Sequence, residues 1–156
     1  MKTSYLLPHK YKTLGWILLV VGLIIGLIVF YGGYETDLLK IKVITIYDEG
    51  GFLGGKKGFF KIIENNILDE LAALSIIIGG IIVGFSKEKV EDEFIYKLRK
   101  DSLVWAILFN YMVLILAIIF VYDFTFFHVL VFNMFTPLLF FVIRFNFLKL
   151  KSNHEE

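Results

Sequence analysis

The sequence predicts an all-α membrane protein with four transmembrane helices and a small extracytoplasmic cap made of one strand and one amphipathic helix. Of the 156 residues, 58% are hydrophobic, 17% are aromatic and only 20% are charged, and the mean hydropathy is +0.75. A soluble domain of this size cannot bury so much apolar surface. The apolar residues also fall into long uncharged blocks separated by short charged segments, which is the pattern of a polytopic membrane protein.

The first predicted span covers residues 14–31, a block of 18 residues without a charge. A spanning helix needs about 20 apolar residues, with a range of roughly 17–25. Lysines precede the block, as they do in a secretory signal, but the apolar core of a signal is shorter, roughly 7–15 residues. No Ala-x-Ala cleavage pattern follows the block, so we expect a retained helix.

The next predicted part is an outer loop, residues 32–66, that forms the cap. Residues 39–47 are rich in β-branched side chains and roughly alternate, which predicts a strand. A lone strand needs a partner, either residues 51–54 or a second copy of the protein. From residue 59 the apolar positions recur every three or four residues, which predicts an amphipathic helix that runs into the second span, residues 67–85.

A charge-dense connector, residues 86–102, separates the second and third spans. It holds five Lys/Arg and five Asp/Glu around an apolar stripe, and Glu93 and Lys97 form a favourable i,i+4 pair. This pattern predicts a short amphipathic helix. The third span follows at residues 103–122, and after a tight turn at Asp123 the fourth covers residues 125–147.

The distribution of Lys and Arg predicts the orientation. Eleven of them lie in the N-terminal segment, the connector and the C-terminal end, whereas the longer 32–70 segment holds five and the turn before the fourth span holds none. Basic residues favour the cytoplasmic side. We therefore expect both termini and the connector in the cytoplasm, residues 32–66 outside, and a location in the bacterial cytoplasmic membrane.

Two pairs of glycines are candidates for helix packing. Gly22 and Gly26 lie four residues apart in the first span, as do Gly80 and Gly84 in the second. Such spacing places both glycines on one helix face, where another backbone can approach closely. The pairs predict general packing within the bundle or, as the alternative, a homo-oligomer.

Few polar residues are expected inside the membrane. They are Ser75, Asn110, Asn133 and Thr136. Ser75 and Asn133 lie at similar depths from the outer interface, so we expect them to share an interhelical hydrogen bond, worth about 0.6 kcal/mol. Structural roles are favoured over a role in lining a substrate path.

The sequence predicts no catalytic, cofactor or metal site. Gly50–Lys56 matches G-x-x-x-x-G-K, but Lys57 stands where a nucleotide-binding loop needs Ser or Thr, so we interpret it as a chance match in a turn. There are no cysteines, and the three histidines fall on separate segments. The net charge of +1 provides no field for direct nucleic-acid binding.

Short motifs within residues 86–147 carry a resemblance to a known family. They are Ser86-Lys87-Glu88-Lys89, Glu91-Asp92-Glu93, Leu98-Arg99, Trp105-Ala106, Asn110-Tyr111, Asn133-Met134-Phe135-Thr136 and Ile143-Arg144-Phe145. This part of the chain resembles uncharacterised four-helix membrane proteins of Bacteroidetes-type bacteria. These often accompany a small helix-turn-helix regulator, so the resemblance implies a cytoplasmic regulator protein as a partner, but no activity.

These observations together predict a non-enzymatic protein of the inner membrane, in contact with the lipid bilayer, that acts as a sensory or regulatory accessory. Its expected docking surface is the connector, through Glu91, Asp92, Glu93 and Arg99. A small transporter or channel subunit is the alternative, and a membrane-embedded enzyme is the third candidate. Deep carboxylates or a polar cavity would favour transport, and a convergent nucleophile and base would favour an enzyme.

Overall fold

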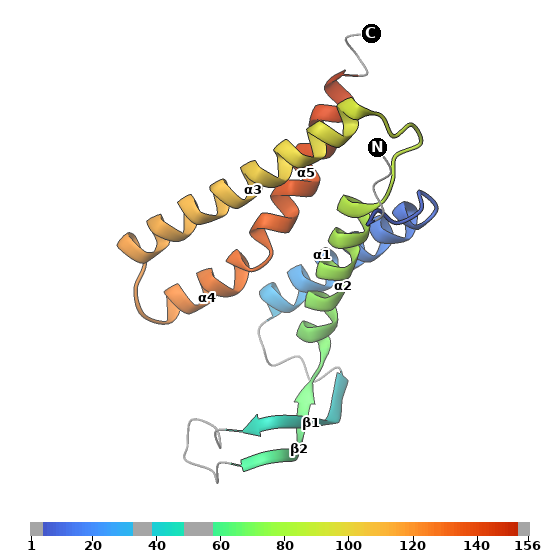
Figure 1. Ribbon diagram of the computed structural model, residues 1–156. Coiled ribbons are helices and arrows are strands. Elements are labelled where there is room, and N and C mark those ends of the chain that lie inside the picture. Colours follow the sequence, from blue (N-terminus) through green and yellow to red (C-terminus); the bar gives the residue numbers. More distant parts are fainter. Residues whose placement is uncertain (1–4, 33–38, 49–57, 153–156) are drawn as a thin grey trace. The chain divides into compact units, whose positions relative to one another are not determined.

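The computed structural model describes residues 5–32, 39–48 and 58–152, which form five helices and two strands (Figure 1). In chain order these are α1 (Tyr11–Gly32), β1 (Lys40–Asp48), β2 (Gly58–Asn66), α2 (Leu68–Phe85), α3 (Glu93–Phe120), α4 (Asp123–Asn133) and α5 (Thr136–Ser152). The chain divides into two compact units. Residues 22–74 make up a hairpin unit, and the residues before and after them make up a helical unit.

Three helices, α1, α2 and α3, are long and apolar enough to cross a membrane. Helices α4 and α5 are long and apolar enough to cross a membrane only when taken together, and they are bent by 44° at the break between them. The described residues therefore hold three candidate spans, or four if this bent pair is one span. Most side chains in the three long spans are exposed. This finding confirms a mostly helical fold compatible with a multi-pass membrane protein, together with a small two-stranded sheet.

The expected strand at residues 39–47 is present as β1, but its partner differs from both alternatives. β1 pairs antiparallel with β2, with Val43 opposite Ile63 and Tyr47 opposite Phe59. The expected amphipathic helix over residues 59–66 is therefore wrong, because this stretch is β2. Its apolar spacing fits a helix over a short window, but the backbone hydrogen bonds offered by β1 fix it as a strand.

Helix α3 is longer than the predicted third span. It begins at Glu93, inside the predicted connector, and its 28 residues extend about 42 Å at 1.5 Å per residue. Asp92 is its N-cap, with the carboxylate accepting a hydrogen bond from the Ile95 N–H at 2.7 Å. The second half of the connector is therefore one rigid rod with the third span.

The predicted fourth span is broken. A turn at residues 134–135 separates α4 from α5, and Pro137 is the second residue of α5. Proline has no N–H, and its ring clashes with the carbonyl four residues earlier, here that of Asn133. This clash explains why α4 ends at Asn133.

The helical unit packs through glycines on α2 and a core of large apolar side chains. A Cβ at Gly79 would lie 2.5 Å from the backbone nitrogen of Leu19 on α1, so the two helices touch backbone to backbone there. A Cβ at Gly80 or Gly84 would meet the side chains of α5 residues Leu138 and Phe141, respectively. α3 and α5 lie side by side (Figure 1). The largest fully buried side chains come from α2, α3, α5 and the α2–α3 loop, and they are Val83, Ser86, Ser102, Phe141, Val142 and Phe145.

Candidate functional site

The segment before α1 is bound to the segment that follows α2. The Leu7 N–H donates to the Phe85 carbonyl at 2.9 Å, and the Lys87 N–H donates to the Leu7 carbonyl at 2.9 Å, which makes a short parallel bridge. The His9 ring nitrogen Nδ1 lies 2.9 Å from the Lys87 carbonyl oxygen and therefore donates its proton to it. These bonds hold the start of α1 beside the loop between α2 and α3.

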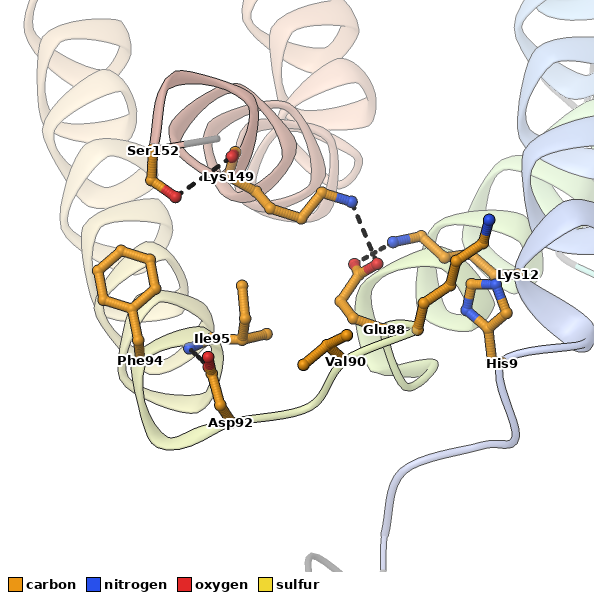
Figure 2. Close-up of a pocket in the computed structure, with 10 residues that line it drawn as sticks. His9, Lys12, Glu88, Val90, Asp92, Phe94, Ile95, Lys149 and Ser152 are labelled. Atoms are coloured by element: carbon orange, nitrogen blue, oxygen red, sulfur yellow. Dashed lines mark hydrogen bonds and ion pairs between the residues drawn. The ribbon is translucent and has the colours of Figure 1, made fainter. Parts of the chain in front are cut away.

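Glu88, in that loop, joins two helices through opposite charges (Figure 2). One carboxylate oxygen pairs with the Lys12 ammonium from α1, and the other lies 3.1 Å from the Lys149 ammonium of α5. The Glu88 side chain is only 8% exposed. Burial alone would raise the pKa of the Glu88 carboxyl, but the hydrogen bonds and positive charges of the two lysines outweigh it and hold the pKa below its usual value.

A second ion pair lies beside the first. The Arg99 guanidinium is 4% exposed and binds Glu91 in a bidentate manner, with contacts of 2.5 Å to Oε1 and 3.1 Å to Oε2. It also donates to the Ser86 carbonyl at 3.3 Å, and its carbon Cζ lies 5.1 Å from the centre of the Phe145 ring. The planar fork of arginine suits this two-point contact with a carboxylate.

The loop that carries both glutamates is itself held closed. The Glu88 N–H donates to Glu91 Oε2 at 2.9 Å, and Asp92 caps α3. We call the five charged residues Lys12, Glu88, Glu91, Arg99 and Lys149 the polar clamp. It connects α1, the α2–α3 loop, α3 and α5 at one end of the helical unit.

The structure places three of the four predicted docking residues in intramolecular contacts. Glu91 and Arg99 pair with each other, and Asp92 caps α3. Glu93 is exposed in the first turn of α3, and the next exposed charged residues on that helix are Lys97, Lys100 and Asp101. The exposed charges at the start of α3 are therefore Glu93, Lys97, Lys100 and Asp101, and Glu91 and Arg99 are occupied with each other.

No hydrogen bond joins the predicted intramembrane polar residues to one another, all of which lie in the described part of the chain. Asn133 Oδ1 is buried without a hydrogen bond, so Ser75 does not donate to it, and Asn110 Oδ1 is likewise buried and unpaired. The Thr136 hydroxyl bonds to the Phe132 carbonyl at 3.3 Å. The guanidinium carbon Cζ of Arg144 lies 5.2 Å from the centre of the Trp105 ring.

The two predicted glycine pairs have different surroundings. Gly80 and Gly84 face α5, in keeping with helix packing within the chain. Gly22 is buried and Gly26 is half-buried on the part of α1 that belongs to the hairpin unit. A homo-oligomer through either pair stays a prediction.

Sequence reasoning missed Lys12, Glu88 and Lys149 as a cluster. Glu88 is 76 residues from Lys12 and 61 from Lys149, so no local spacing connects them. The one signal in the sequence is that both lysines border apolar blocks: Lys12 precedes the predicted span 14–31, and Lys149 follows the predicted span 125–147. Gly50–Lys56 lies outside the described residues, among which no group of three His, Asp or Glu is suited to hold a metal.

Comparison with known proteins finds no matching family model, no matching curated protein and no matching solved structure. The features that bear on function are therefore the polar clamp and the exposed charges at the start of α3.

Proposed function

We propose that the protein is a non-enzymatic, multi-pass protein of the bacterial cytoplasmic membrane that serves as a sensory or regulatory accessory. Both termini and the α2–α3 loop face the cytoplasm in this proposal, because the Lys and Arg residues are concentrated in these segments. The hairpin of β1 and β2 then lies outside.

The observation that supports a regulatory role is the connectivity of the polar clamp. A single loop of seven residues, 86–92, is bonded to the segment before α1, to Lys12 of α1, to Lys149 of α5 and to Arg99 of α3. A shift of α1 or α5 therefore strains ion pairs that position the first turn of α3. Partly buried pairs of this kind have discrete arrangements, which is what a two-state element requires.

The output surface in this proposal is formed by residues 93–101 at the start of α3. Their exposed charges, Glu93, Lys97, Lys100 and Asp101, are of both signs and do not belong to the clamp. The partner is a cytoplasmic regulator protein that binds these residues through complementary charges when the polar clamp holds α3 in place.

The test is a charge swap that leaves the clamp intact, with Glu93→Lys and Lys97→Glu combined in one chain. The swap keeps the i,i+4 pair while exchanging the two charges, so helicity is retained. We expect weaker co-purification with a regulator encoded beside the protein and altered transcription of its target genes. The control is Lys151→Gln near the end of α5. If the swapped variant binds and regulates as the wild type does, the docking proposal is wrong.

A small transporter or channel subunit is the second candidate, supported by one observation. The side-chain oxygens of Asn110 on α3 and Asn133 on α4 are buried without a hydrogen bond, and polar groups inside a membrane bundle often line substrate paths. Asn133→Leu in proteoliposomes would abolish a solute flux that depends on this residue. Absence of any flux in the wild-type vesicles would count against transport.

A further inference from the structure

A pocket with a volume of about 520 Å³ opens at the polar clamp (Figure 2). One wall is polar and carries His9, Lys12, Glu88 and Lys149. The opposite side carries the apolar residues Val90, Phe94 and Ile95, together with Asp92 and Ser152 (Figure 2). A ligand that fits both sides has a charged or polar head joined to an apolar part.

The charges that line the pocket are unbalanced in favour of a bound anion. Three lysines, Lys12, Lys89 and Lys149, face two carboxylates, those of Glu88 and Asp92. Glu88 is shared between two ammonium groups, so one positive charge is left over in the partly buried pair of lysines. An ammonium group has three N–H donors, and each of these two lysines uses one on Glu88.

The pocket also lies at the level of the lipid headgroups if α1 and α5 are membrane helices. Lys12 is two residues before the first uncharged block, a rise of about 3 Å along the helix. Lys149 lies in the last turn of α5. Basic pockets between helices at this level suit the phosphate of a lipid headgroup, and the apolar residues on the opposite side suit the glycerol and the first acyl carbons.

We propose that this pocket binds the phosphate ester of an anionic phospholipid, with Lys12 and Lys149 as the phosphate ligands. Neutral His9 uses its Nδ1 proton on the Lys87 carbonyl, so its Nε2 becomes a further donor to the phosphate only when the ring is protonated. The proposal rests on the membrane placement given above but not on the regulatory role. Lipid binding and regulator docking are therefore separable by experiment.

The test uses the full chain, purified in detergent and titrated with phosphatidylglycerol while native mass spectrometry counts the bound lipids. Lys149→Gln removes one phosphate ligand but leaves Glu88 paired with Lys12. We expect its affinity for phosphatidylglycerol to fall about tenfold, as the loss of one charge-assisted bond predicts. Lys97→Gln is the matched control, because it removes the same charge from an exposed position on α3 outside the pocket. Equal affinities of these two variants would overturn the proposal.

Glu88→Gln tests the charge argument in the opposite direction. It removes the internal anion that occupies both ammonium groups, so we expect tighter binding of phosphatidylglycerol than in the wild type. Circular dichroism checks that the helices persist. Unchanged or weaker binding by a variant with wild-type helicity would refute the assignment of the lysines as phosphate ligands.

Two further titrations identify the source of the phosphate. Phosphatidylcholine carries the same phosphate but has no net charge. If the protein binds phosphatidylcholine as tightly as phosphatidylglycerol, the pocket does not select an anionic lipid. Glycerol phosphate and inorganic phosphate compete in solution. If phosphatidylglycerol stays bound in the presence of these competitors, the ligand is a membrane lipid. If either competitor displaces phosphatidylglycerol at a concentration below that of the lipid, the lipid is rejected and the pocket is assigned to a soluble phosphate.

Discussion

Arg99 is a positive charge that the fold has removed from solvent, being 4% exposed, and its two contacts to Glu91 compensate for this burial. We predict that Glu91→Gln lowers the free energy of unfolding by about 3 kcal/mol, because it leaves a buried charge without its partner. Unfolding in mixed micelles, followed by circular dichroism, measures this loss.

The matched control for that prediction is Glu93→Gln, which changes the same group two residues away at an exposed position. A change within about 0.5 kcal/mol is expected there. Replacing both members of the pair, with Glu91→Leu and Arg99→Met, should cost less than Glu91→Gln alone, because no buried charge then remains. A double variant less stable than the single one would contradict this account.

Glu88 gives the clamp a dependence on acidity. Its pKa is lower in the folded protein than the ordinary value of about 4.5, so its contribution to stability is complete above that pH and is lost as the pH falls through the lower folded value. We predict that acid below about pH 4.5 destabilises the wild type more than Glu88→Gln. The melting temperatures of both proteins are compared across the acid range. If the two melting temperatures fall by the same amount as the pH is lowered, the prediction is contradicted.

The charged residues of the connector were identifiable from the sequence, but their contacts were not. The density of charge around Glu91, Asp92 and Arg99 predicts an amphipathic connector helix, whereas in the structure Glu91 and Asp92 lie in the α2–α3 loop and Arg99 lies on α3. That Arg99 turns inward follows from Phe145 and Ser86, which are distant in sequence. Tertiary contacts of this kind have no local signature.

At the scale of elements, glycines of both helices bring α1 and α2 close together, because a Cβ at Gly15 of α1 would lie 2.7 Å from the Ile82 side chain of α2. A Cβ at Gly79 would meet backbone atoms of α1, 2.5 Å from the Leu19 nitrogen and 2.9 Å from the Gly15 oxygen, whereas a Cβ at the neighbouring Gly80 would meet only the Leu138 side chain. We predict that Gly79→Ala destabilises the protein by about 1–3 kcal/mol, because backbone cannot move aside as a side chain can.

Gly80→Ala is the control on the same helix with the same substitution. The gain in helix propensity, about 1 kcal/mol, should offset much of its strain. Thermal denaturation in detergent compares the two variants. If Gly79→Ala and Gly80→Ala have the same melting temperature, whether below that of the wild type or equal to it, the close approach at Gly79 does not control the packing of α1 on α2.

Periodicity predicted the elements well where one pattern was long and failed where two patterns overlapped. The spans α1 and α2 and the strand β1 follow from apolar length and alternation. β2 reads as a helix because its apolar residues also fit a spacing of three or four, and only its pairing with β1 decides between them. The break before α5 was readable from Pro137, but the apolar content of residues 125–147 outweighed it.

At the scale of the whole molecule, the long helices expose apolar side chains, which is compatible with contact with lipid. Val20, Ile24 and Leu27 of α1 are about half exposed, and so are Leu108, Ile115 and Ile119 of α3. Soluble monomers rarely expose so much contiguous apolar surface. The distribution of Lys and Arg predicts the orientation of the chain in a bilayer.

The absence of cysteine from the sequence makes this orientation directly testable. We predict that Ile44→Cys, which is 72% exposed on β1, reacts with a membrane-impermeant maleimide in intact spheroplasts. Lys97→Cys, exposed on α3, should react only after the membrane is permeabilised. The reverse pattern would show that the eleven basic residues lie outside, and it would remove the regulator from reach of α3. Labelling of both positions from the same side would require an even number of crossings between them, which α2 alone does not provide.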